Sequence, residues 1–231
     1  METSDIQKKF KRLQNELMSR INTEDTFNID SVKLIAGVDL AYWNDDNGQE
    51  YAVCCIAVID KATHNLIETR SYSGMIEVPY MPGFLAFREL PHVLQAVELL
   101  ENKPDIYMFD GNGYLHPRHM GIATHASFYL NTPTIGVAKT YYRVEKNLEY
   151  IEPDACSGSY MDIVYNNEVY GRVLRTHDNV RPVFVSIGNN ISLDTAVRLT
   201  MDMVGSESRI PVPTRLADLE THKMRAVLRD K

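Results

Sequence analysis

Apolar residues recur with two different periods along the chain, and each period predicts a different kind of element. Residues 32–41 are apolar almost throughout, which is typical of a strand buried on both faces. The runs 51–60 and 66–76 follow across polar turns and predict two more strands of an antiparallel meander. A helix is predicted over residues 4–21, because apolar residues return there every three or four positions: Ile6, Phe10, Leu13, Leu17 and Ile21.

Helix and strand patterns alternate in the middle of the chain. A helical stripe over residues 84–100 is followed by a short apolar strand, 106–109, that runs into a glycine-rich turn. Small and apolar residues then predict a helix over 121–129, and a second apolar strand covers 134–138. Because a helix joins the two strands, we expect them to be parallel.

Four polar side chains follow these two strands. Asp110 comes directly after the first strand, and Lys139 comes directly after the second. Between them lie His116, a candidate base, and Arg118, a second cation. Open α/β sheets place their ligands at the carboxyl ends of strands, so we expect all four to face one spot. The alternatives are a solvated loop histidine for His116 and an ordinary surface lysine for Lys139.

Three further acids could either bind a cation or have a purely structural role. Asp39 lies inside the first apolar strand, where a carboxylate is costly unless backbone donors satisfy it or a cation binds it. Glu89 lies beside the apolar stripe of a helix and on its own would be a surface residue. Asp218 is predicted in the first turn of a last helix, 216–228, where the helix dipole alone favours an acid.

A stiff loop precedes the helix predicted over residues 84–100. Pro79, Pro82 and Gly83 fix this loop, and Tyr80 stands between the two prolines. An aromatic ring on a rigid loop suits a wedge or a stacking platform for a base. The alternative is a tyrosine that packs the loop onto the body of the protein.

The remaining C-terminal pattern predicts a hairpin over 161–175, a strand over 183–187 and a helix over 192–204. At 231 residues, 44% of them hydrophobic and 24% charged, we expect one soluble domain, 1–231, with the N-terminal helix (1–24) packed on it.

Composition removes several classes of protein. No run approaches the roughly 18 apolar residues of a membrane span, and the N-terminus resembles no secretory signal. Three cysteines without metal-ligand spacing argue against a disulfide framework and a zinc site, and they fit a reducing cytoplasm. A net charge of -7 means that any nucleic acid must be held by a local cationic surface.

The order of strands and helices, with Asp39, Glu89 and Asp110 at their positions, resembles the ribonuclease H-like fold. That fold is an α/β mixed sheet flanked by helices, and it gathers three carboxylates over one end of the sheet. Convergent carboxylates repel one another without a cation, and Mg²⁺ prefers such hard oxygen ligands. The resemblance therefore implies a Mg²⁺ site, in which Mn²⁺ could substitute.

Six segments stand in order along residues 33–218: IAGVDLAY, PYMPGFLAFRELP, FDGNGYLHPR, GIATH, PTIGVAKT and VPTRLAD. They resemble the successive motifs of the endonuclease V family, repair nucleases that act on deaminated purines, chiefly hypoxanthine. One such segment would be a weak signal, whereas six in register are specific. Gly188-Asn189-Asn190 departs from the Gly-His-Arg-like sequence that is common in the family.

This resemblance implies roles for the candidate residues. Lys139 and His116 would act at the cleavage site, and Tyr80 would fill the gap left by an extruded base. The metal would be held by four carboxylates: Asp39, Glu89, Asp110 and Asp218. Glycine-rich turns allow a base to approach the main chain, so the substrate-binding residues would include Pro82, Gly83, Gly111, Arg118 and Gly121.

The sequence thus predicts a monomeric, cytoplasmic endonuclease, dependent on Mg²⁺, that acts in repair on strands containing deoxyinosine or inosine, without a membrane partner. One alternative is another ribonuclease H-like nuclease that acts on inosine-containing RNA or branched DNA. A second is a nucleic-acid-binding protein with a degenerate site. Loss of a carboxylate or of Lys139 would favour the second alternative, and none of these residues is lost.

Overall fold

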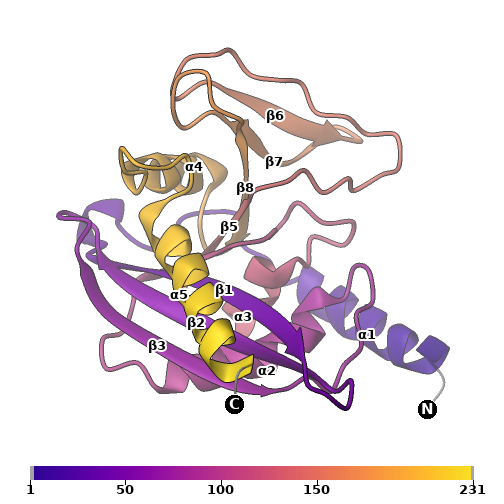
Figure 1. Ribbon diagram of the computed structural model, residues 1–231. Coiled ribbons are helices and arrows are strands. Elements are labelled where there is room, and N and C mark those ends of the chain that lie inside the picture. The colour runs from indigo at the N-terminus through magenta and orange to yellow at the C-terminus, as the bar shows by residue number, and fades with distance from the viewer. Residues whose placement is uncertain (1–2, 230–231) are drawn as a thin grey trace.

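Within residues 3–229, which this computed structural model describes, one mixed sheet of eight strands runs through the protein, with helices against both faces (Figure 1). The strands lie in the order β3-β2-β1-β4-β5-β8-β7-β6. Their bounds are Leu34–Asn44 (β1), Glu50–Asp60 (β2), Leu66–Met75 (β3), Ile106–Phe109 (β4), Thr134–Ala138 (β5), Tyr160–Tyr165 (β6), Glu168–Leu174 (β7) and Val183–Asn189 (β8).

The pairing of the strands confirms the predicted α/β mixed sheet of ribonuclease H-like type. Strands β1, β2 and β3 form an antiparallel meander, while β4 is parallel both to β1 and to β5. The predicted hairpin is also present, because β6 and β7 pair antiparallel across a turn at Asn166 and Asn167. Both asparagines have left-handed backbone angles, φ 51° and 63°, which asparagine tolerates better than most residues.

The helices form two layers on the sheet. On one face α2 and α3 pack over a core that includes Ala36, Val38 and Phe109. On the other face α4 and α5 pack over a second core that includes Ile35 and Met108. None of the described helices has the length and apolar character needed to cross a bilayer. The helix bounds are Thr3–Met18 (α1), Leu85–Glu98 (α2), Ile122–Leu130 (α3), Leu193–Asp202 (α4) and Val212–Arg229 (α5), with a 3₁₀ turn at Ile29–Ser31.

Helix α1 packs beside α2 and α3 and supports the loop that precedes α2. The ring of Phe10 stacks on that of Phe87 with 3.9 Å between centroids. Gln14 is fully buried, and its Nε2 donates hydrogen bonds to the carbonyls of Gly83 (3.1 Å) and Met120 (3.5 Å). The helix ends at Met18, three residues before the predicted end.

Helix α5 begins at Val212, four residues before the predicted start. Pro213 lies in the first turn of the helix, where the missing N–H of a proline would have no partner. Asp218 is therefore in the second turn, and its predicted place in the first turn is wrong. Attraction to the exposed amides of the helix start does not explain this acid.

Asn189 and Asn190, where the sequence departs from the common family pattern, have a structural role at the end of β5 away from Lys139. Asn189 lies opposite Thr134, the first residue of β5, whereas Lys139 follows the other end of that strand. The Asn189 side chain accepts a hydrogen bond from the Asn22 amide at 2.7 Å, and the Asn190 amide donates to the Asn22 carbonyl at 2.8 Å. These asparagines therefore hold the segment that follows α1.

Candidate active site

Side-chain alternation along three strands decides which residues reach the face covered by α5. The core on this face contains residues of β1, β4 and β5, among them Ile35, Met108 and Val137. Successive strand residues point to opposite faces, so residues at even spacing share a face. Asp39, Asp110 and Lys139 follow those core residues by four, two and two positions. All three side chains are consequently directed to the α5 face at the carboxyl edge of the sheet.

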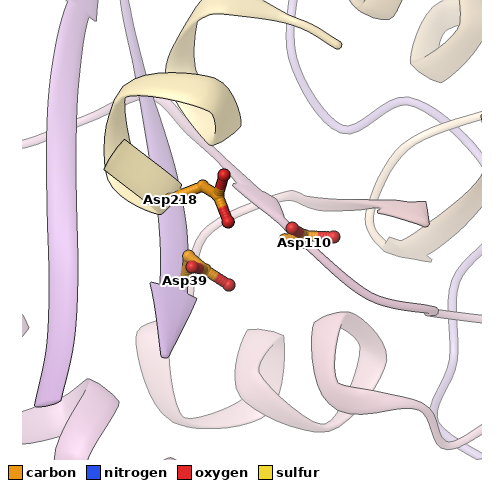
Figure 2. A group of neighbouring side chains, drawn as sticks. All are labelled: Asp39, Asp110 and Asp218. Atoms are coloured by element: carbon orange, nitrogen blue, oxygen red, sulfur yellow. The ribbon is translucent and has the colours of Figure 1, made fainter. Parts of the chain in front are cut away.

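Three carboxylates meet at this edge (Figure 2). Asp39 comes from β1, Asp110 follows β4, and Asp218 extends from α5, which crosses the sheet in front of β1 (Figure 1). One oxygen from each carboxylate lies within 4.8 Å of the other two. The acids predicted from three separate segments of the sequence thus form one cluster.

Two donors hold the cluster. Thr221, one helical turn after Asp218, donates its hydroxyl to Asp39 Oδ2 at 2.8 Å. Lys139 Nζ lies 2.6 Å from Asp110 Oδ2 and 3.1 Å from Asp218 Oδ1, so it bridges two of the acids. These contacts argue against Lys139 as an ordinary surface lysine, and they show that a hydroxyl on α5 rather than the backbone satisfies Asp39.

The electrostatics of the cluster favour a cation. Burial raises the pKa of Asp39 to about 6, and the charge of Asp110 adds to the rise. Burial also raises the pKa of Asp110, although the hydrogen bond from Lys139 opposes that change. For Lys139 burial lowers the pKa, but its hydrogen bonds to the two acids outweigh burial and raise it overall. One lysine does not neutralise three carboxylates, and their oxygens are the hard donors that divalent cations such as Mg²⁺ prefer.

Glu89 lies behind this cluster rather than within it. Its side chain is buried on α2 and accepts a hydrogen bond from the Tyr42 hydroxyl of β1. Burial raises the pKa of Glu89 to about 7; the Tyr42 hydrogen bond opposes this rise, and the nearby charge of Asp39 adds to it. The charge of the cluster therefore affects the pKa of Glu89. Glu89 does not belong to the group of three acids whose oxygens lie together.

A pocket of about 150 Å³ opens beside the cluster, on the side of α2 and α3. The three glycines predicted to line a base pocket are all in its wall: Gly83, Gly111 and Gly121. At Gly121 a Cβ atom would come within 2.3 Å of the Asn112 carbonyl oxygen, so this turn requires glycine. Other lining residues include Tyr80, Asn112, His116 and Tyr142.

His116 lies in the wall of the pocket, not among the carboxylates. It is buried, which rules out the solvated loop histidine, and its Nδ1 accepts hydrogen bonds from the amides of Arg118 (3.2 Å) and Met120 (3.3 Å). Burial and the charge of Arg118 lower its pKa to about 3. A neutral imidazole whose Nδ1 is occupied is suited to fixing the pocket wall rather than to removing a proton at the cluster.

Arg118 does not face the carboxylates either. Its Nε donates to Gln14 Oε1 at 2.6 Å, its Nη2 donates to the Gly83 carbonyl at 2.8 Å, and its guanidinium lies over the Phe84 ring. The expectation that four polar side chains face one spot is thus wrong for His116 and Arg118. The turn after β4 takes His116 into the pocket wall and Arg118 against Gly83 and Phe84, just before α2.

Tyr80 projects from the loop before α2. Its side chain is 66% exposed, while the next residue, Met81, is buried and anchors the loop. The interpretation in which the Tyr80 ring packs the loop onto the body is therefore wrong. The ring borders the mouth of the pocket, and Pro82 beside it is exposed.

Several contributors were not identified from the sequence. Thr221 could have been found, since it lies three residues after Asp218 and shares its helix face. Tyr42 and Gln14 gave no comparable signal, because a strand tyrosine and a helix glutamine acquire their roles through tertiary contacts with Glu89 and Gly83.

A ribonuclease H-like sheet that gathers carboxylates and a lysine at the carboxyl ends of its strands defines the class of ribonuclease H-like nucleases. Comparison with known proteins narrows the class. The sequence model of the Endonuclease V family matches residues 15–219. Endonuclease V of Bacillus thuringiensis subsp. konkukian is 58% identical over 219 residues, which cover 95% of this chain and 92% of that protein. The chain belongs to the endonuclease V family and is a nuclease.

Solved structures agree with this assignment. The crystal structure of Bacillus subtilis endonuclease V is 50% identical and aligns with a TM-score of 0.94, covering 100% of this chain and 95% of that one. Ciona intestinalis endonuclease V, solved in complex with a 24mer DNA containing an inosine followed by a ribo-adenosine, is 27% identical. Its TM-score is 0.87, with 98% of this chain and 100% of that one covered.

Proposed function

We propose that this protein is a magnesium-dependent endonuclease that hydrolyses a phosphodiester bond near a deaminated purine in nucleic-acid repair. The proposal rests on one observation: the pocket and the carboxylate cluster lie directly beside each other. Asp110 belongs to the cluster, and the next residue, Gly111, lines the pocket. A base held in the pocket would therefore bring phosphates of its own strand to the carboxylates.

Asp39, Asp110 and Asp218 would hold the divalent cation, with Glu89 acting through water. Such a cation activates water and neutralises charge on the phosphate. Mn²⁺ can take its place, since carboxylates suit both metals. Lys139 keeps Asp110 and Asp218 in position and places an ammonium group where charge develops on the phosphate.

The pocket would take the extruded base. Asn112 supports hypoxanthine over adenine at the ring nitrogen, because its side-chain oxygen is buried without a hydrogen-bond donor among the described residues. A base edge with an N–H group would satisfy this acceptor, and hypoxanthine carries a ring N–H where adenine has an unprotonated nitrogen. Tyr80 at the mouth would stack on a neighbouring base and hold the strand open.

The DNA complex of the Ciona relative, which contains an inosine, supports the same substrate class for this chain. We propose that DNA or RNA carrying deoxyinosine or inosine is the partner, and that the protein acts as a monomer of one domain in the cytoplasm. The carboxylate cluster makes no distinction between ribose and deoxyribose, so the experiment below includes inosine in both DNA and RNA strands.

The test compares strands that differ at one position. Inosine or adenosine is placed at the same site in DNA and in RNA, and a four-way DNA junction without inosine is included. Each is incubated with Mg²⁺, Mn²⁺ or a chelator. We expect cleavage of the inosine strands with either metal and none with the chelator. Equal cleavage of adenosine strands or of the junction would favour another nuclease of this fold, and binding without cleavage would indicate a non-catalytic protein.

A further inference from the structure

The described residues include two cationic side chains at the catalytic edge to which the proposed function gives no role. In the sheet, β8 lies next to β5 on the side away from β4. Ala138 is opposite Phe184, so the chain just after β5, at Lys139, lies alongside the chain just before β8, at Pro182. Arg181 precedes Pro182 directly, and Arg209, from the loop between α4 and α5, is fastened to the Pro182 carbonyl by a hydrogen bond of 2.8 Å.

Arg209 lies on the opposite side of the cluster from the base pocket. The pocket is formed by the starts of α2 and α3, which cover one face of the sheet. Arg209 comes from the loop that leads into α5, on the other face, and it attracts Asp110 electrostatically. The carboxylate cluster is therefore between the pocket and Arg209.

Arg209 forms no salt bridge with an acidic side chain among the residues that the structure describes. Its hydrogen bond to the Pro182 carbonyl uses Nη1 alone. Its guanidinium is partly buried, and the nearby Arg181 repels it. Asp110 attracts Arg209 but does not pair with it, so in the part of the chain that the structure describes the partly buried guanidinium keeps a positive charge that an anion would neutralise.

Phosphate is the anion that fits this position. A strand whose base lies in the pocket passes the cluster and continues toward β8. The protein carries a net charge of -7, so it needs local cations at the points where the backbone of the strand is held. A planar guanidinium can contact two phosphate oxygens at once, which suits it to binding a backbone phosphate rather than to promoting the chemical step.

We propose that Arg209, assisted by Arg181, binds a backbone phosphate of the cleaved strand on the side of the cluster away from the base pocket. The strand then has three fixed points: the base in the pocket, the scissile phosphate at the carboxylates, and a further phosphate at Arg209. This inference rests on the proposed function, and it assigns the strand a path across the catalytic edge.

The test measures single-turnover cleavage of an inosine-containing strand against protein concentration, with Mg²⁺ saturating. Arg209→Ala is expected to raise the half-saturating protein concentration about tenfold and to reduce the slope of log affinity against log salt by about 1. Arg209→Lys should restore most of the affinity, because it keeps the charge. Arg198→Ala is the matched control, since it removes one exposed arginine from α4.

A neutral-phosphate scan locates the contact. Methylphosphonate replaces one phosphate at a time on either side of the inosine, and each strand is tested with the wild type and with Arg209→Ala. We expect the difference between the two proteins to disappear at one phosphate only, on the same side of the inosine as the cut. A difference that persists at every position would overturn the proposal.

Other outcomes separate the possible failures. If Arg209→Ala has the half-saturation and salt slope of the wild type, the phosphate contact does not exist. If Arg209→Ala and Arg209→Lys both lower the unfolding temperature and the Mg²⁺ affinity, Arg209 supports α5 and the proposal is wrong. If the wild type treats inosine and adenosine strands alike, the proposed function fails independently of Arg209.

Discussion

The positive charge of Lys139 offsets part of the repulsion between the carboxylate cluster and a polyanionic substrate. Its ammonium group contacts Asp110 and Asp218, and it lies at the edge that a phosphate must approach. Lys139→Ala is expected to lower the single-turnover rate by about a hundredfold, as for removal of one preorganised charge-stabilising donor. Affinity for the metal should not fall, because removing a cation leaves the carboxylates more negative.

The measurement for Lys139 combines single-turnover cleavage at saturating protein and Mg²⁺ with calorimetric Mg²⁺ binding. A rate loss accompanied by lost metal binding would mean that the lysine only holds the acids in place. A normal rate with weaker strand binding would reduce Lys139 to a positioning contact.

Tyr80 should contribute to binding through its ring. Stacking of a base on an aromatic side chain is worth roughly 1–3 kcal/mol, so Tyr80→Ala should weaken binding of an inosine-containing strand by about tenfold to a hundredfold. Tyr80→Phe should change little, and Tyr129→Ala, which removes another exposed tyrosine, is the control. Fluorescence anisotropy with labelled strands measures the affinities. Equal losses in the alanine and phenylalanine variants would assign the effect to the hydroxyl.

The raised pKa of Asp39 makes metal binding depend on pH. Burial, and then the charge of Asp110, raise this pKa to about 6. Below pH 6 a proton competes with the cation, so Mg²⁺ affinity should fall by about tenfold per pH unit and should level off above pH 7. Thr221→Val removes a hydrogen bond that favours the ionised form, so it should move the transition to higher pH. Calorimetric Mg²⁺ titrations between pH 5 and 8 test this prediction. A Mg²⁺ affinity that stays constant over this range would contradict it.

Some site residues could be located from the sequence and others could not. Asp110 and Lys139 each follow a short apolar run directly, so a strand end fixes their position. His116 and Arg118 belong to a turn whose course depends on how it packs against α2, and sequence spacing did not reveal that course. Arg209 lies in a loop placed by the packing of α5, which no local pattern encodes.

At the scale of elements, α5 decides whether the cluster forms. It carries Asp218 and Thr221, and it crosses β1 at Gly37. A Cβ atom at Gly37 would lie 2.0 Å from the Pro213 backbone, so only glycine permits this approach. Gly37→Ala should lower the free energy of unfolding by about 1–3 kcal/mol through overpacking, and it should weaken Mg²⁺ binding as Asp218 moves away.

Denaturant unfolding and metal calorimetry test the Gly37 variant. Gly205→Ala is the control, because its Cβ atom would meet a valine side chain at 3.3 Å rather than backbone. A Gly37→Ala protein with wild-type stability and metal affinity would show that the contact with α5 is not needed.

The elements themselves were largely predictable, for a physical reason that also explains the exception. The strands around β1, β4 and β5 are short apolar runs closed by polar turns, and that pattern is local. The helix predicted over 216–228 begins earlier, at Val212, because Pro213 lies in its first turn, where a proline has no hydrogen bond to lose. In the structure, alternation along the strands places Asp39, Asp110 and Lys139 on one face.

At the scale of the molecule, the protein is acidic overall, but the carboxyl edge of its sheet carries both negative and positive groups. The pocket lies on the side of α2 and α3, the carboxylates lie at the edge, and Lys139, Arg209 and Arg181 provide cations toward β8. The net charge of -7 repels a polyanion at long range, so we expect binding to depend on these local groups and on the metal cation. Under the proposed function, cleavage depends on the carboxylate cluster, and recognition depends on the pocket beside it.

The most direct test of this account is Mg²⁺-dependent cleavage of a strand with one deoxyinosine by Asp110→Asn, with Asp46→Asn as an exposed control. We predict that Asp110→Asn folds with at least wild-type stability, since one of the repelling charges is gone, but binds no Mg²⁺ and does not cleave at saturating metal. The control should cleave normally. Near wild-type turnover by Asp110→Asn at saturating Mg²⁺ would contradict the assignment of the cluster as the catalytic metal site.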